Sequence, residues 1–269
     1  SQLKLKMNKL KFVIVLLLSG TYLFAQENNP IHTAVPTLSI TPDARGAGMG
    51  DVGVATTPDE NSQYWNPAKY VFTKSDAGVS FTFTPWLSAL VSDINLSYLT
   101  GYYKLSDRQA LSTSLRYFSL GEIPMYDAQG NSLTSAYPNE FAFDVAYSQK
   151  LSERFSAATA LRFIYSDLNN GVNMNGGTEI YPGMAVAADV AAYYRQPITM
   201  STGDANLALG LNISNIGSKI SYDDVDNYFI PTNMRLGATF EYPIDEYQSI
   251  SFSADANKLL VPTPNGTDM

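Results

Sequence analysis

The chain has 269 residues, of which 25 are Asp or Glu and 17 are Lys or Arg, giving a formal net charge of −8. This acidic balance argues against nucleic acid as a partner, because phosphate binding requires clustered Lys and Arg. The chain contains no cysteine, which excludes a disulfide framework and thiolate chemistry.

Residues 1–25 predict a secretory signal peptide. Lys9 and Lys11 form a short basic region, an apolar run covers 12–18, and a polar break leads to Ala25. A membrane helix would need ~20 apolar residues, and this run is much shorter. We expect cleavage after Ala25, which removes four lysines and no acid, so that 13 basic and 25 acidic residues leave a net charge of −12.

Residues 26–76 show no alternation and form a second predicted region. Its characteristic residues are Gly46, Gly48, Gly50, Asn66, Pro67 and Ala68. A nucleotide loop does not fit these glycines, because no Lys-Ser or Lys-Thr follows them and no strand precedes them. We expect the small residues to let the backbone pack tightly inside a barrel, and the Asn-Pro pair to form a turn.

From Ala77 onward, apolar and polar residues alternate with a period of two, which predicts an all-β, antiparallel fold. Several segments exceed the five or six residues usual in soluble sheets and approach the ~10 residues of a tilted membrane strand. The nine predicted strands lie near 77–84, 91–104, 109–120, 139–150, 154–166, 183–195, 205–215, 232–243 and 248–258.

The connections between these strands alternate in length. Long ones cover 121–138, 167–182 and 216–231, with 85–90 shorter. The others are mostly tight, at 105–108, 151–153 and 244–247, with 196–204 somewhat longer. Outer-membrane barrels are built in this way, with the long loops outside the cell.

The two strand faces carry different residues. One parity is apolar and has aromatic residues near its ends, as in the interfacial belts of membrane barrels; these are Tyr102, Tyr147, Phe155, Tyr194 and Tyr242 at one end and Tyr117 and Tyr165 at the other. The other parity is charged, with Arg116, Asp144, Arg162, Asp189 and Arg235. A dry sandwich core cannot hold such charges without close pairing, and a lipid-facing Arg costs ~2–4 kcal/mol. We therefore expect a polar lumen, whose charges neutralise one another or, less ordinarily, line a permeation path.

Nine strands predict an incomplete barrel. Bacterial barrels of this type close with an even number of strands, and lipid tolerates no open sheet edge. The chain stops within 260–269, which has the composition of an outward loop. We expect the 77–269 barrel region to lack C-terminal strands; a miscount that hides eight or ten strands is the alternative.

No catalytic residue, metal ligand or cofactor is expected. His32 is the single histidine, and no nucleophile motif lies near it. Asp223, Asp224 and Asp226 offer oxygen ligands to Ca²⁺, but the Gly and Glu positions of a known calcium loop are absent, which favours a solvated loop.

The same long connection contains apolar and aromatic residues, namely Tyr222, Tyr228, Phe229 and Ile230. Exposed residues of this kind on an outer loop are candidates for a partner-binding surface. The alternative is that they fold over the mouth of the barrel.

Five sequence blocks carry a resemblance to a known family: 34–38, 42–50, 63–70, 139–142 and 210–217. The glycine-rich run followed by an Asn-Pro-Ala turn before the first strand resembles the FadL-like outer-membrane proteins. The amino-acid sequences of these blocks are more similar to the PorV (LptO) family within that superfamily. The likeness covers nearly the whole mature chain.

The resemblance implies a fourteen-stranded barrel in the full-length protein, integral to a Gram-negative outer membrane, with residues 26–76 as a plug or hatch. It implies a type IX secretion shuttle that receives cargo by its C-terminal sorting domain at the translocon barrel and passes it to cell-surface sortase and attachment proteins. Two alternatives remain: a FadL-like channel for hydrophobic small molecules, and a lipid A deacylase-related protein.

Overall fold

The computed structural model describes residues 31–87, 91, 93–126, 130–169, 180–200, 203–223, 225–245 and 248–262. Within them, His32–Val261 form one compact unit, to which the description below applies. The predicted signal peptide lies outside the described residues. No helix in the described part of the chain is long and apolar enough to cross a membrane.

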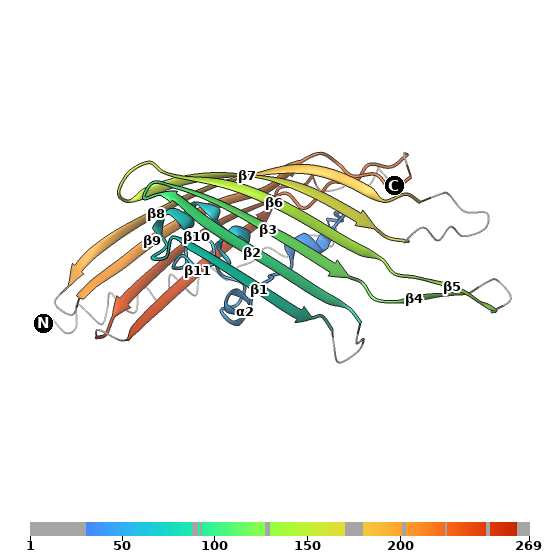
Figure 1. The fold of residues 1–269 in the computed structure, drawn as a ribbon, viewed down its shortest axis with the longest axis horizontal. Coiled ribbons are helices and arrows are strands. Elements are labelled where there is room, and N and C mark those ends of the chain that lie inside the picture. The colour runs from blue at the N-terminus through green and yellow to red at the C-terminus, as the bar shows by residue number, and fades with distance from the viewer. Residues whose placement is uncertain are drawn as a thin grey trace, which may run out of the picture. The chain divides into compact units, whose positions relative to one another are not determined.

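Nine long strands form one antiparallel sheet in the described part of the chain, in the order β1-β2-β3-β6-β7-β8-β9-β10-β11 (Figure 1). They are β1 (Ala77–Pro85), β2 (Asn95–Ser106), β3 (Gln109–Ser119), β6 (Asn139–Lys150), β7 (Phe155–Asp167), β8 (Gly183–Met200), β9 (Gly203–Gly217), β10 (Asn233–Pro243) and β11 (Ser249–Leu259). The short strands β4 (Ile123–Tyr126) and β5 (Ser132–Ala136) pair separately. The predicted antiparallel sheet of about nine strands is confirmed, and as described it is a partial barrel.

The start of β2 differs from the prediction. This strand begins at Asn95 and not at 91. The turn from β1 closes just before it, where the Trp86 amide donates to the Ile94 carbonyl at 2.9 Å. The extra residues assigned to the strand therefore belong to the connection.

Two further features of the strands were not predicted. β8 and β9 stay paired from Pro197 and Asn206 to Met200 and Gly203, within the region 196–204 that we predicted as a connection. The backbone stays paired there because ladder hydrogen bonds need no apolar side chains. The β4–β5 hairpin inside 121–138 also escaped detection, since strands of four and five residues carry too little periodicity.

The two faces of the sheet have opposite character. Apolar side chains are exposed on one face; Val79 is 75 % exposed and Leu161 71 %. Charged and small side chains are buried on the other, where Asp189 is 2 % exposed. A water-soluble monomer rarely exposes so extended an apolar surface, so the charged parity faces the interior and the apolar parity faces outward. All five residues predicted for the lumen are buried on the inner face: Arg116, Asp144, Arg162, Asp189 and Arg235.

Tyr102 was assigned to the wrong face. It is buried, and its ring stacks on Tyr70 with the two centroids 4.7 Å apart. Its neighbour Tyr103 is exposed on the outer face instead. The sequence of β2 is ambiguous because both parities contain apolar and aromatic residues, so alternation alone does not identify the inner face.

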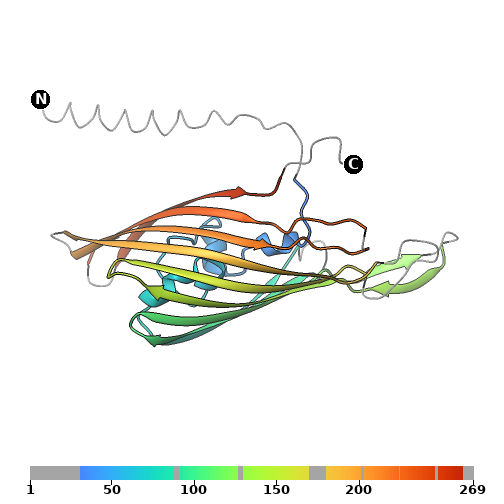
Figure 2. The same ribbon diagram turned by 90° about the horizontal axis from the view of Figure 1, so that it is seen from above.

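Residues 32–76 lie against the buried face of the sheet, which curves around them (Figures 1 and 2). Their short helices are η1 (Pro36–Ser39), α2 (Ala44–Gly48), α3 (Ser62–Trp65) and η2 (Pro67–Phe72). Helix η2 contacts β2, β3, β6, β7 and β8. Small buried residues on these and neighbouring strands make room for the segment, among them Ala110, Ala146, Ala158, Ala191 and Ala208.

Close approach of this segment to β9 requires a glycine. A Cβ on Gly210 would lie 2.1 Å from the Val54 carbonyl oxygen, a backbone atom that cannot turn aside. We expect Gly210→Ala to destabilise the folded protein by roughly 1–3 kcal/mol, the usual range for overpacking. Chemical unfolding in detergent measures this effect. Gly48→Ala is the matched control, because its Cβ would meet nothing within 4 Å; equal midpoints for the two variants would contradict the packing argument.

Candidate functional site

A buried charge network crosses the inner face of the sheet. Arg162 Nη2 lies 2.9 Å from the Oδ2 atoms of both Asp144 and Asp189. Asp144 sits directly opposite Arg162 in the β6–β7 register, and Ser114 Oγ donates to Asp144 at 3.1 Å. One arginine therefore pairs with two carboxylates across three strands.

The β8–β9 ladder is irregular beside this network. Its register shifts between Ala188 and Val190, and Asn215 has a φ of 58°, in the left-handed region that Asn tolerates better than most residues. In this geometry the backbone amide of Asn215 donates to Asp189 Oδ1 at 2.8 Å. The side-chain oxygen of Asn215 accepts from Arg162 Nη1. The irregularity thus adds polar partners to a buried ion pair.

The other two lumen arginines hold the N-terminal segment. Arg116 donates to the carbonyl oxygen of Leu38 at 3.0 Å and to that of Ile40. Arg235 Nη2 donates to the Tyr64 hydroxyl at 2.7 Å, and its Cζ lies 4.5 Å from the centre of the Tyr64 ring. Both guanidinium groups are thus occupied by the segment that fills the inner face.

The three predicted glycines differ in packing and in backbone conformation. A Cβ on Gly46 would lie 2.4 Å from the Trp65 ring, so this glycine permits the tight packing that we expected. Asp43 organises the same place: it accepts from the Gly46 amide and from Trp65 Nε1, each at 2.7 Å. Gly50 has a φ of +82°, and Gly48 has open space around it.

The predicted Asn-Pro-Ala turn is the start of η2. Asn66 Nδ2 donates to the Val54 carbonyl at 3.0 Å and to the Ala192 carbonyl of β8 at 2.9 Å, and its Oδ1 caps the Ala68 amide. Pro67 occupies the first turn, and its carbonyl accepts from Ser148 Oγ at 2.7 Å. One side chain therefore joins two parts of the N-terminal segment to the sheet.

Lys69 in η2 is a buried cation that forms no ion pair with a carboxylate of the described residues. Its Nζ donates to the Gly53 carbonyl at 2.8 Å and to Thr56 Oγ1 at 3.2 Å. Burial lowers the pKa of Lys69 to about 8. These contacts fold the glycine-rich turn against η2.

The outer-loop residues divide between core and surface. Ile230 is only 2 % exposed, because it packs among Val35, Leu38 and Ile164, so for this residue the alternative of a loop folded inward applies. Tyr228 and Phe229 are exposed. The Phe229 carbonyl accepts from the Ala34 amide at 2.9 Å, so the loop is docked on the N-terminal segment.

A cavity of about 440 Å³ lies between this loop and the N-terminal segment. Its lining is largely apolar, with Glu140 as a buried acidic group that accepts from Ser166 Oγ at 3.1 Å and from Thr37 Oγ1. The lining residues are His32, Thr33, Ala34, Val35, Pro36, Glu140, Leu168, Ile180, Tyr222, Asp223 and Tyr228. We call this the outward pocket, because it lies at the strand ends joined by the long connections.

The outward pocket is lined both by residues that we predicted for a site and by residues that we did not. Tyr222 and Tyr228 were predicted for partner binding, whereas His32 was set aside. Burial raises the pKa of Tyr222, whose hydroxyl donates to Ser166 Oγ at 2.9 Å. Sequence reasoning missed Glu140 as a site residue; its place on the charged parity was the only available signal.

The Asp223 side chain accepts hydrogen bonds from backbone amides of its own loop. Its Oδ1 accepts from the amides of Val225 and Asp226 at 3.0 and 2.9 Å, which lowers the pKa of Asp223. Asp224 lies outside the described residues. The described carboxylate thus acts as a turn-stabilising acceptor at the protein surface.

Comparison with known proteins agrees with this architecture. No curated protein matches the chain. The family model described as type IX secretion system protein PorV matches residues 24–266, nearly the whole chain. That family consists of secretion-system components and implies an outer-membrane barrel. The chain belongs to the PorV family of type IX secretion system proteins.

Proposed function

We propose that this protein is an integral outer-membrane shuttle of the type IX secretion system. It receives secreted cargo by the C-terminal sorting domain at the translocon barrel and passes the cargo to the cell-surface sortase and attachment complex. Family membership supports the secretion role, and the exposed apolar face of the sheet supports residence in lipid.

One observation carries the proposal: the inner face of the sheet is occupied. Arg116, Arg235 and Asn66 tie the N-terminal segment to the strands, and the remaining lumen charges pair with one another. A protein built in this way acts by binding at its surface and not by conducting a chain or a solute through its interior. The same anchors argue against a FadL-like channel.

The outward pocket is the proposed contact site for the translocon or cargo. Its apolar lining suits an aliphatic or aromatic side chain of a partner, and Tyr228 forms part of its exposed rim. Glu140 provides a buried acceptor that can fix the orientation of a polar group. We therefore assign a binding role to this pocket.

Substitution at the rim tests this role. We expect Tyr228→Ser to lower the amount of cargo recovered with the protein from outer membranes by at least fivefold, because truncating a tyrosine that anchors an interface costs ~2 kcal/mol or more. Tyr137→Ser is the matched control: it also removes an exposed tyrosine, from the connection between β5 and β6. Quantitative recovery of tagged cargo measures the effect.

Two outcomes would count against the proposal. Equal cargo recovery for the Tyr228 and Tyr137 variants would exclude the outward pocket as the contact site. Normal secretion in a strain that lacks the whole protein would remove the secretion role itself. Equal amounts of each variant in the membrane exclude an insertion defect.

A further inference from the structure

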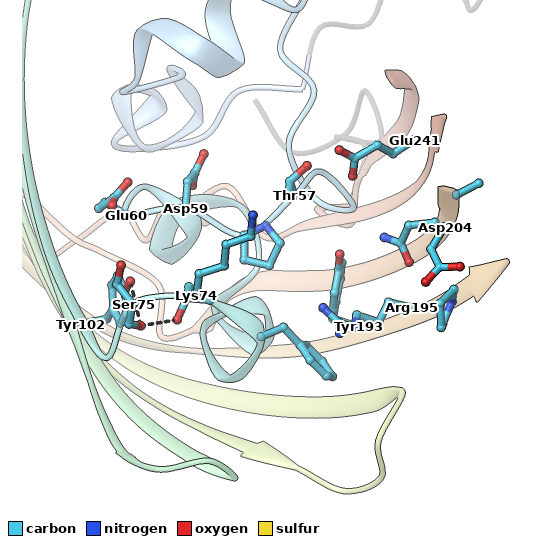
Figure 3. Close-up of a pocket in the computed structure, with 16 residues that line it drawn as sticks. Thr57, Asp59, Glu60, Lys74, Ser75, Tyr102, Tyr193, Arg195, Asp204 and Glu241 are labelled. Atoms are coloured by element: carbon cyan, nitrogen blue, oxygen red, sulfur yellow. Dashed lines mark hydrogen bonds between the residues drawn. The ribbon is translucent and has the colours of Figure 1, made fainter. Parts of the chain in front are cut away.

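A second cavity, of about 600 Å³, lies at the other end of the strands, where the short turns join β2 to β3 and β8 to β9 (Figure 3). Residues 57–60 and 72–75 of the N-terminal segment form one side, and the ends of β2, β8, β9 and β10 form the rest. We call it the short-turn pocket. Its volume is within the ~300–1,000 Å³ that ligand pockets occupy.

The hydroxyl of a largely buried tyrosine, Tyr193, points into this pocket (Figure 3). Tyr193 is 1 % exposed and lines the cavity, between the N-terminal segment and Arg195 (Figure 3). No hydrogen bond reaches its hydroxyl from any described residue, whereas Tyr194, its outward neighbour, donates to Gln196 at 2.9 Å. The hydroxyl opens onto the cavity, so it is available to a polar group that enters the pocket.

Most carboxylates around the pocket form no ion pair in the described part of the chain, although Glu241 accepts a hydrogen bond from Ser249 Oγ at 3.3 Å. Asp59 pairs with Arg45, but Glu60, Asp204 and Glu241 form no ion pair in the described part of the chain. Two cations, Lys74 and Arg195, line the same cavity but form no ion pair with these carboxylates among the described residues.

The two cations differ in their surroundings. Arg195 is held over the ring of Phe72, with its Cζ 4.8 Å from the centroid, and neither it nor Lys74 forms an ion pair among the described residues. Besides Asp59, three carboxylates therefore line the pocket together with two cations, and one of these cations is already stacked on an aromatic ring.

We propose that the short-turn pocket binds a basic segment of a partner protein, through Lys or Arg side chains. Their ammonium or guanidinium groups donate to Glu60 on one side of the cavity, to Asp204 and Glu241 on the other, and to the Tyr193 hydroxyl oxygen (Figure 3). The rings of Phe72 and Tyr102 line the cavity and cover the aliphatic stem of the side chain. This inference is independent of cargo binding at the outward pocket, because the two cavities lie at opposite strand ends.

The experiment uses the full-length protein in detergent micelles and trilysine amide as the probe. We expect titration calorimetry to detect binding that weakens as salt rises, because charge interactions are screened. The combined variant Glu60→Gln, Asp204→Asn and Glu241→Gln should weaken it at least tenfold, and Tyr193→Phe severalfold. Triglutamate should not bind.

Asp107→Asn is the matched control, because it removes an exposed carboxylate at the same end of the sheet, outside the pocket. It should leave trilysine binding unchanged. Absence of trilysine binding, undiminished binding in the combined variant, or equal binding of triglutamate would each overturn the proposal. Unchanged unfolding midpoints for the single Tyr193→Phe and Glu241→Gln variants keep the binding result separate from misfolding.

Discussion

Arg162→Met is expected to destabilise the folded protein by roughly 3–5 kcal/mol, because it leaves two buried carboxylates without their shared cation. Asp144 and Asp189 are 5 % and 2 % exposed, so water cannot replace the lost partner. The midpoint of urea unfolding in detergent micelles measures the loss. Less protein should also reach the folded state when it is expressed in outer membranes.

Two comparisons separate the charge from the side chain. Arg154→Met removes an arginine from the exposed β6–β7 turn, where it donates to Gln196 Oε1 at 2.7 Å, and should change stability by less than ~0.5 kcal/mol. Replacing Asp144, Arg162 and Asp189 together by Leu, Met and Leu should cost less than Arg162→Met alone, because no unpaired charge remains. A triple variant that is less stable than the single one would show that packing, not charge balance, holds this region.

Alternation made the sheet and its orientation predictable. Small or polar residues alternate with large apolar ones along these strands, and a charge among them indicates the buried face. Asp144 and Arg162 are examples, and the structure places them opposite each other. The prediction failed where this contrast is weak. Tyr102 lies in a strand with apolar residues on both faces, and the short strands β4 and β5 offer too few positions for a period to emerge.

The partners of the site residues could not be predicted in the same way. Arg116 and Arg235 were placed in the lumen, but nothing local identifies the Leu38 carbonyl or the Tyr64 hydroxyl as their acceptors. Similarly, Asp255 in β11 accepts from the amide of Gly53 at 2.8 Å, across 202 positions of sequence. Such contacts follow from the closed packing of the segment on the sheet, not from residue spacing.

Loop composition was an incomplete guide to exposure. Tyr228 and Ile230 are two residues apart and equally suited to a partner surface by chemistry. The backbone pairing of Ile220 with Tyr228 and the contact of Phe229 with Ala34 turn the end of the loop inward, so that Ile230 is buried and Tyr228 is not. Only the path of the loop over the N-terminal segment distinguishes them.

Trp65→Ala should have the other large effect, since this residue joins the N-terminal segment to the sheet. Its indole is 3 % exposed, donates to Asp43 at 2.7 Å and lies 5.1 Å below the Arg235 guanidinium, so truncation leaves a cavity and an unpaired acceptor together. We expect a loss of ~3–5 kcal/mol in chemical unfolding.

The chain supplies its own control, because its second tryptophan, Trp86, is 37 % exposed at the β1–β2 connection. Trp86→Ala should leave both stability and permeability nearly unchanged. If residues 26–76 act as a plug, Trp65→Ala should also admit a large hydrophilic antibiotic to cells that otherwise exclude it, because the anchored segment blocks the interior. If Trp65→Ala lowers stability but leaves antibiotic uptake unchanged, Trp65 contributes to packing only. That result would contradict the plug hypothesis, because loosening a plug should let solute pass.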